Sequence, residues 1–211
     1  MDSSFYKIIF LSFFVSLAGC QYAFVGLAEK IIEDRKHDEQ IFDFSMHTGI
    51  VSGLISLEPD TLFEVNIDVW NRKVLLTGRI DDFLMYRKVE EYVLNYPNVK
   101  KLFNEISYAK KQNFNVMVGG ECKRGENYVD VQNPRSKFDD FLIEQTIRIR
   151  LIGLGNSSVF NIHWRSIEGK VYLIGEAYSL ENKMKMIRVI CGIMDVVDVK
   201  SFIEIRPEKS P

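Results

Sequence analysis

The spacing of apolar residues changes along the chain from a helical period to strict alternation. Residues 37–57 carry apolar side chains at helical spacing, at Ile41, Phe44, Ile50 and Leu54. Residues 63–69 then alternate between apolar and polar, which is typical of a half-buried strand. The elements expected next are a tight turn at 71–72, a second strand over 73–80, a helix over 82–95 and a last strand over 99–108. The predicted order of this segment is α-β-β-α-β.

The same pattern recurs 97 residues later in an unbroken register. Asp43-Phe44 aligns with Asp140-Phe141, and Lys73-Val74 aligns with Lys170-Val171. The elements expected in this second copy are a helix over 137–154, strands over 160–164 and 170–177, a helix over 179–192 and a strand over 196–206. Chance seldom keeps one register over such a length, so the chain is interpreted as two copies of one domain.

The element order predicts an α+β fold. In each copy an antiparallel hairpin takes a third strand through a helical crossover, which makes a three-stranded mixed sheet with both helices on one face. Gly78 and Gly175 end matching strands, and we expect both to be structural because a close backbone approach or an unusual dihedral angle excludes a side chain there.

Short motifs in both copies resemble the BON domain, named for bacterial osmotically inducible and nodulation proteins. The hairpin segments KVLLTG (73–78) and KVYLIG (170–175) carry this resemblance, and Asn104 keeps the asparagine of the family's last strand. Arg72 stands where the family favours glycine, and the second copy has Ser201 in place of the asparagine. The resemblance implies tandem α-β-β-α-β domains without catalytic activity.

The N-terminus has the features of a bacterial secretory signal. Lys7 precedes an apolar run over residues 8–17 that is too short to span a bilayer, and small residues then lead to Cys20. Leu-Ala-Gly-Cys at 17–20 resembles the lipobox of bacterial lipoproteins, which implies that Cys20 is acylated and begins the mature chain. An ordinary signal peptide with an incidental cysteine is the alternative.

These signals predict a division of the chain into six segments. They are a signal peptide (1–19), a tether (20–36), a first BON-like domain (37–108), a linker (109–136), a second BON-like domain (137–206) and a tail (207–211). By resemblance to lipoproteins with two BON domains, Gln21 after the cysteine favours an anchor on the periplasmic side of the outer membrane.

Composition and charge argue against several classes of function. A net charge of −2 lacks the basic excess of a nucleic-acid-binding protein. The three histidines do not lie at metal-ligand spacing, and we find no nucleophile elbow or phosphate loop, so no enzyme, metal or cofactor is expected. The acid pairs 81–82 and 139–140 open helices, where capping explains them. A disulfide between Cys122 and Cys191 is left open.

One helix face differs between the copies. Phe138, Leu142, Gln145 and Ile149 fall within about 60° of one another on a helical wheel, and we call this set the apolar stripe. The equivalent residues of the first copy are Ile41, Ser45, Thr48 and Ser52, so that face is expected to be polar there. Arg148 and Arg150 flank the stripe, a combination that suits an anionic lipid surface. Docking of the stripe against the other domain or the linker is the alternative.

The resemblance to lipoproteins with two BON domains implies a membrane-anchored, non-enzymatic lipoprotein that binds phospholipid and supports outer-membrane integrity, and the basic residues beside the apolar stripe favour anionic lipid. Cys20 would be the lipidation site, and Phe138, Leu142, Ile149, Arg148 and Arg150 would contact lipid. The alternative is a periplasmic adaptor that uses packing between BON domains, with envelope proteins of secretion or assembly machinery or with further copies of itself as partners.

Overall fold

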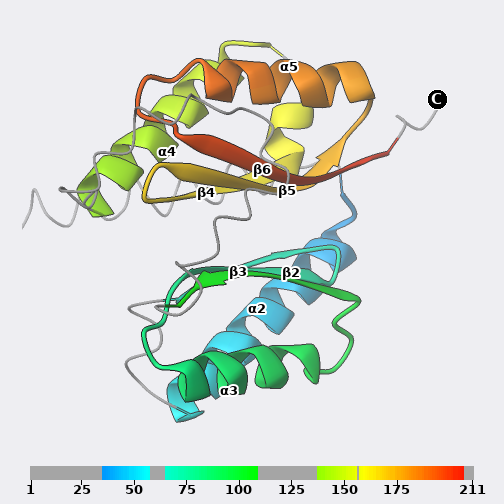
Figure 1. Cartoon of the computed structure of the whole chain (residues 1–211). Helices are drawn as coiled ribbons and strands as arrows, with labels where there is room; N and C mark the ends of the chain where they lie inside the picture. Colours follow the sequence, from blue (N-terminus) through cyan, green and yellow to red (C-terminus); the bar gives the residue numbers. More distant parts are fainter. Residues whose placement is uncertain (1–34, 58–64, 109–136, 156, 207–211) are drawn as a thin grey trace, which may run out of the picture. The chain divides into compact units, whose positions relative to one another are not determined.

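The computed structural model describes residues 35–57, 65–108, 137–155 and 157–206. Residues from Arg35 onward belong to one compact unit, and the expected signal peptide, tether, linker and tail fall largely outside the described residues. The described part contains four α-helices, one 3₁₀ helix and two three-stranded mixed sheets (Figure 1). The expected α+β class is confirmed.

The first repeat has the expected order of elements. They are α2 (His37–Leu57), β1 (Val65–Trp70), β2 (Lys73–Arg79), α3 (Phe83–Leu94) and β3 (Lys101–Ser107). β1 pairs with β2 antiparallel, and β2 pairs with β3 parallel, so the helical crossover joins the two parallel strands. Asp82 caps α3 by accepting a hydrogen bond from the Leu84 N–H, which confirms the expected capping role at this position.

The second repeat copies this arrangement with one addition. Its elements are α4 (Lys137–Ile152), η4 (Ser157–Asn161), β4 (Ile162–Ile167), β5 (Lys170–Ala177), α5 (Leu180–Cys191) and β6 (Asp198–Ile205). The strand expected from residue 160 begins instead at Ile162, because the preceding residues form the 3₁₀ turn η4. The strand order β4-β5-β6 and the mixture of antiparallel and parallel pairing match the first repeat.

Each hairpin turn is held by an acid from the first helix of its repeat. Asn71 and Arg72 have positive φ angles, and so do Glu168 and Gly169, as two-residue turns between antiparallel strands require. Asp43 on α2 accepts the backbone N–H groups of Asn71 and Arg72 at 2.6 and 2.9 Å. Asp140 does the same for Glu168 and Gly169 at 2.8 and 2.9 Å. Asp140 lies in the first turn of α4, where the helix dipole favours an acid, but its carboxylate is used by the hairpin and not as the expected cap.

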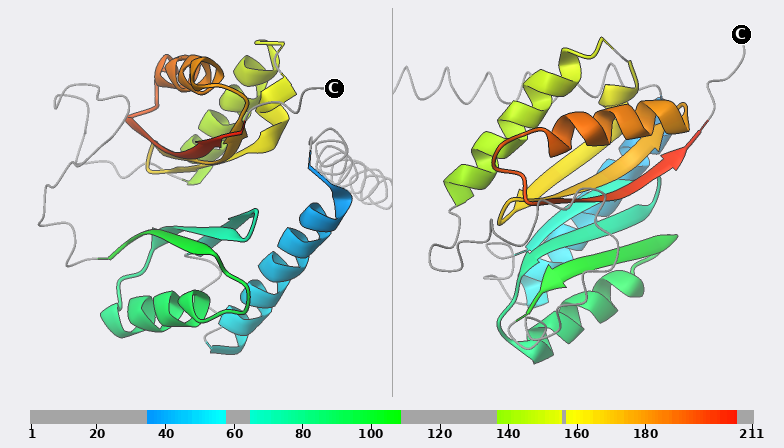
Figure 2. Two further views of the ribbon diagram at one scale, coloured as in Figure 1. Left: turned by 90° about the vertical axis from the view of Figure 1, so that its right-hand side faces the viewer. Right: turned by 45° about the horizontal axis from the view of Figure 1, so that its top comes forward.

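One core lies between the helices and the sheet in each repeat (Figure 2). Ile50 and Leu54 of α2 pack on the first sheet, and Ile147 and Leu151 of α4 pack on the second. Ile41 and Phe44, which the sequence analysis grouped with Ile50 and Leu54 as apolar residues at helical spacing, are not part of this core. Ile41 is 64% exposed and Phe44 is 57% exposed.

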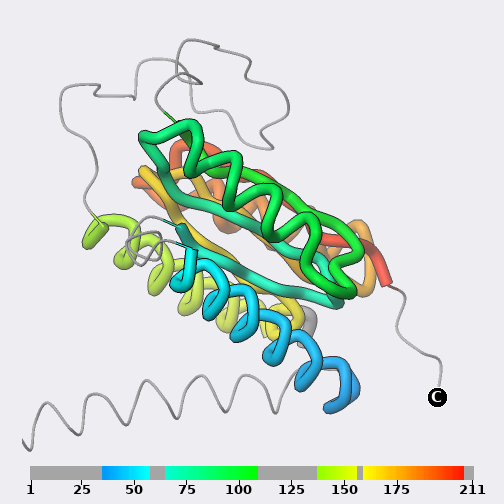
Figure 3. The backbone as a smooth tube through the Cα atoms, turned by 90° about the horizontal axis from the view of Figure 1, so that it is seen from below, coloured from blue at the N-terminus to red at the C-terminus, as the bar shows by residue number. Residues whose placement is uncertain are grey.

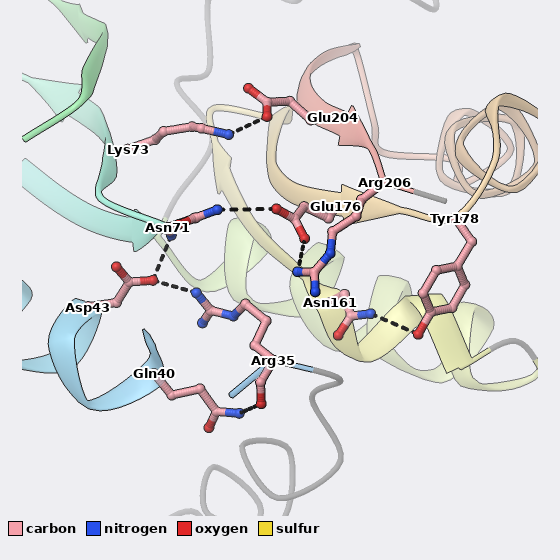
Figure 4. Close-up of polar contacts among 10 residues, drawn as sticks. All are labelled: Arg35, Gln40, Asp43, Asn71, Lys73, Asn161, Glu176, Tyr178, Glu204 and Arg206. Carbon is pink, nitrogen blue, oxygen red and sulfur yellow. Dashed lines mark hydrogen bonds and ion pairs between the residues drawn. The ribbon is translucent and has the colours of Figure 1, made fainter. Parts of the chain in front are cut away.

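The sheet faces that carry no helices contain a third apolar cluster, drawn from both repeats. Trp70, Leu75, Tyr172 and Ile174 are buried in it, and Phe103, Ile167 and Phe202 pack against them. Charged side chains from both sheets surround this cluster, and several pair across it. Figure 4 shows one of these pairs, Lys73 with Glu204. The unit from Arg35 onward is therefore held together by its two sheets as well as by the core of each repeat.

Candidate membrane-contact face

The candidate site is the outward face of α4, the first helix of the second repeat. Figure 3 shows α2 and α4 on the side of the unit where β1 and β4 lie, with α3 and α5 on the other side. The buried residues of α4 are Ile143, Ile147 and Leu151. Phe138 and Ile147 are nine residues apart, which at 100° per residue places the stripe about 180° from the core.

Polar contacts fix how α4 lies along the edge strand β4, and so which way the stripe points. The Trp164 indole Nε1–H donates to the Glu144 carbonyl at 3.2 Å, and the Ser166 N–H donates to Glu144 Oε1 at 2.9 Å. The Ser166 hydroxyl lies 2.7 Å from Asp140 Oδ1. These bonds join two successive turns of the helix to the strand, so the helix cannot roll about its axis without breaking them.

The apolar members of the stripe are exposed to solvent. Phe138 is 66% exposed, Leu142 47% and Ile149 72%. The same face also presents Phe141 and Ile152, which the sequence analysis did not include. Both lie within about 60° of Phe138 on the helical wheel, so the same calculation, applied to every position, would have found them. Among the described residues, the apolar cluster shared by the two repeats comes from the sheets and does not include the stripe.

The two arginines expected beside the stripe are placed differently from each other. The Arg148 guanidinium lies 5.7 Å from the centre of the Trp164 ring, and its side chain is half-buried. Arg150 is exposed, with Nη1 3.5 Å from the Gly192 carbonyl oxygen. Arg150 is thus accessible to solvent beside the end of α5, whereas the structure turns Arg148 toward the sheet.

Burial and neighbouring charges act on the acid that holds α4 to β4. Burial raises the pKa of Glu144, while the Arg165 charge and the Ser166 N–H act in the opposite direction. The Asp68 carboxylate in turn raises the pKa of the Arg165 guanidinium, and burial opposes that shift. This charged group lies beside β4, away from the stripe, so it positions the helix without taking part in its exposed face.

The other residues singled out from the sequence have separate places. Gly78 and Gly175 have φ angles of 128° and 150°, in the range that favours glycine. Cys20 lies outside the described residues. Cys191 is disulfide-bonded, and the remaining cysteines of the chain, Cys20 and Cys122, both fall outside the described residues.

The first repeat contributes an apolar face that the sequence analysis did not recognise. Ile41, Phe44 and Ile55 are all exposed on α2. They align with Phe138, Phe141 and Ile152 of α4, so the expected contrast between a polar and an apolar helix holds only at Ser45 and Ser52. A second difference is charge, because α2 contains no Lys or Arg and begins with Asp38 and Glu39.

The described residues contain neither a membrane-spanning helix nor a cluster of metal ligands. No described helix is long and apolar enough to cross a membrane. Within the same residues, His, Cys, Asp and Glu side chains do not form a group of three that could hold a metal ion.

Comparisons with known proteins give limited information. No protein-family model matches the chain, and no curated protein matches it. Among solved structures, CdsD, a structural protein of the type III secretion system of Chlamydia trachomatis, is 13% identical with a TM-score of 0.29, covering 77% of this chain and 93% of that one. Its C-terminal domain is 14% identical with a TM-score of 0.28, covering 82% and 100%. Scores this low carry no argument for fold or function.

Proposed function

We propose that this protein is a non-enzymatic, lipid-anchored envelope protein with two BON-like repeats, and that the second repeat contacts phospholipid through the outward face of α4. The observation that carries the proposal is the exposure of Phe138, Leu142 and Ile149 on the side of α4 that faces away from the core. An anchor at Cys20 on the periplasmic side of the outer membrane would hold this face close to a lipid surface.

The chemistry of the face suits a bilayer interface. Full burial of one such side chain contributes about 1.5–3 kcal/mol, and partial insertion contributes less. Lys137 and Arg150 lie on the same helix, and a cation close to an anionic surface adds about 1 kcal/mol. Apolar residues beside basic residues on one helix are typical of helices that lie in the interface plane.

Vesicle co-sedimentation of the chain lacking residues 1–20 tests this proposal without the anchor. We expect binding to vesicles that contain phosphatidylglycerol, and weaker binding as salt is raised. Leu142→Ser with Ile149→Ser introduces the serines that α2 carries at the equivalent positions, so folding should be preserved. Loss of about 2–3 kcal/mol corresponds to binding weakened roughly 30- to 150-fold.

A matched control uses the other exposed helix. Ile41→Ser with Phe44→Ser also removes two exposed apolar residues, but from a helix without basic residues. This control should bind vesicles as the unsubstituted chain does. Equal binding by all three proteins would show that α4 is not the lipid-contact face.

A second candidate function is a protein adaptor, and α2 is the observation that favours it. Its exposed Ile41, Phe44 and Ile55 lie on a helix with an acidic first turn and no basic residue, which suits a protein partner better than anionic lipid. If the chain without its anchor binds no vesicle of any headgroup composition, the adaptor function becomes the better account.

A further inference from the structure

The contacts between the two repeats follow an exchange rule. Equivalent residues of the repeats are 97 positions apart, as with Asp43 and Asp140. Suppose that two similar surfaces meet around a two-fold axis, and that position A of the first repeat touches position B of the second repeat. Position B of the first repeat then touches position A of the second repeat. Three sets of contacts between the sheets obey this rule, although the residues that fill the positions differ.

One contact joins a position to its own equivalent. Arg165 Nη2 lies 3.3 Å from Asp68 Oδ1, and these residues are 97 positions apart. The Asp68 side chain is 11% exposed and that of Arg165 is 33% exposed. The two copies of this position therefore meet at the axis, and they carry opposite charges.

A second pair of contacts exchanges two positions of the last strands. The rings of Phe103 and Phe202 lie with their centres 4.3 Å apart. Their equivalents in the opposite repeats are Lys200 and Glu105, and these form an ion pair with 2.6 Å between Nζ and Oε2. One arrangement thus gives an aromatic contact on one side of the axis and an ion pair on the other.

A third pair of contacts lies near the hairpins. Arg79 Nη1 approaches Glu168 Oε1 at 3.9 Å. The exchanged contact is between Asn71 and Glu176, with 3.4 Å between Nδ2 and Oε1 (Figure 4). Glu176 also pairs with Arg206 of its own repeat at 2.9 Å. Glu168 and Glu176 of the second repeat therefore each face a hydrogen-bond donor of the first repeat.

If two first repeats or two second repeats paired in this geometry, these favourable contacts would be replaced by unfavourable ones. Two second repeats in the same geometry would oppose Arg165 to Arg165 and would oppose Glu168 to Glu176 twice. Two first repeats would oppose Asp68 to Asp68 and would oppose Phe103 to Glu105 twice. Like charges in a desolvated contact are strongly unfavourable, and such contacts discriminate against wrong partners more than they strengthen the right one.

We infer that the helix-free sheet faces form a recognition surface on which a first repeat accepts a second repeat and rejects another first repeat. The partner of each sheet is the other repeat of the same chain. The inference does not depend on lipid binding. It implies that both sheet faces are occupied within the chain, and that copies of the protein do not assemble through like sheets.

Charge reversal in the full chain tests the inference. Asp68→Arg and Arg165→Asp should each lower the melting temperature, by about 5 °C or more, because each opposes two like charges. The double variant restores opposite charges between the two strands but leaves Glu144 facing an aspartate in place of Arg165. It should therefore be more stable than the Arg165→Asp single variant and recover part of that loss. Arg87→Glu is the control, because Arg87 pairs with Glu90 on the exposed surface of α3, and it should shift the melting temperature little.

A second measurement separates loss of pairing from loss of folding. A protease site introduced within residues 109–121 leaves Cys122 and Cys191 on the same fragment, so a disulfide between them cannot hold the two fragments together. The full chain can then be folded first and cut afterwards. After cleavage, the two fragments of the unsubstituted chain should elute together in gel filtration, those of each single variant should separate, and those of the double variant should stay together. Glu105→Lys with Lys200→Glu provides a second exchange of the same kind.

Two results would overturn the inference. One is that neither double exchange is more stable, or better paired, than its single variants. The other is that the fragments of the unsubstituted chain separate on cleavage while each remains folded.

Discussion

At the scale of single residues, the two equivalent acids Asp43 and Asp140 show how the repeats keep their shape. Each accepts two backbone N–H groups from a hairpin turn whose residues have positive φ angles. Asp43 also forms an ion pair with Arg35, which stacks on the Trp70 ring at 3.8 Å. A carboxylate with several acceptor positions can hold such a turn and the helix that carries it at once.

Gly175 should tolerate no side chain. Its φ is 150°, and a Cβ there would lie 2.2 Å from the Asn161 carbonyl oxygen. Gly175→Ala should therefore lower the free energy of unfolding by about 1–3 kcal/mol, measured by urea denaturation. Gly155→Ala separates strain from steric overlap, since Gly155 has a φ of 63° with nothing within 4 Å of the added Cβ. An equal loss in both variants would show that overlap with Asn161 is unimportant.

Glu144 should make stability depend on pH. Burial raises its pKa above the ordinary value of 4.5, so the folded state favours the protonated form. The stabilisation by protonation is complete below the unfolded-state pKa and is lost as the pH rises through the raised pKa. Glu144→Gln keeps an acceptor for the Ser166 N–H and removes the charge. Its melting temperature, relative to the unsubstituted protein, should therefore rise between about pH 4 and pH 7. A difference that is constant across this range would contradict the assignment.

At the scale of elements, the small residues of α2 let α3 pack closely. A Cβ on Gly53 would lie 1.7 Å from the Tyr92 hydroxyl oxygen, and one on Gly49 would lie 1.9 Å from that of Tyr96. The two tyrosines therefore lie over the glycines. This explains why residues that weaken a helix occur four positions apart within it.

Gly53→Ala should destabilise the protein although alanine is the better helix former. Displacement of the Tyr92 ring should cost about 1–3 kcal/mol, against a gain of about 1 kcal/mol in helix propensity. In a Tyr92→Ala background the overlap is gone, so the same substitution should become neutral or stabilising. Thermal unfolding of the four proteins measures this coupling, and additive effects would show that the contact is not tight.

The elements could be predicted from the sequence because their causes are local. Alternation in the strands, helical spacing and two-residue turns each depend on a few neighbouring residues. The second repeat also shows the same pattern for each element, which supports each prediction independently. The contact between repeats could not be predicted in this way. Asp68 and Arg165 look like ordinary polar positions of half-buried strands, and their pairing links residues 97 positions apart.

The candidate site was predicted in part, for a similar reason. The apolar stripe on α4 follows from helical geometry, and the structure exposes it. Helical spacing alone does not say which of two apolar faces is buried, and α2 exposes Ile41 and Phe44 while it buries Ile50 and Leu54. The direction of Arg148 depends on the Trp164 ring of a strand that follows much later in the chain.

At the scale of the whole molecule, the proposed function depends on a lipid anchor at Cys20. Cys20→Ser should abolish labelling by radioactive palmitate in cells, because the expected lipobox ends at this cysteine. Palmitate labelling that survives in Cys20→Ser would leave the protein without the proposed anchor.

The sheet faces and the outward helix faces differ in what they contact. The sheet faces meet each other, so the outward helix faces are the surfaces available to lipid or to other proteins. α4 combines exposed apolar residues with basic residues, whereas α2 combines them with acids. One chain could therefore lie on a membrane through its second repeat and present its first repeat to another molecule.

The most direct test of lipid contact by α4 is the depth at which its outward face enters a bilayer. A tryptophan substituted for Ile149 in the chain lacking residues 1–20 reports this depth through quenching by brominated phospholipids. The same substitution at Ile41 on α2 is the control, and the unsubstituted chain gives the background from Trp70 and Trp164. Strong quenching and a blue shift for Ile149→Trp, with neither for Ile41→Trp, are the predicted results. Vesicle binding in which the tryptophan at Ile149 is quenched no more than the one at Ile41 would contradict the proposed function.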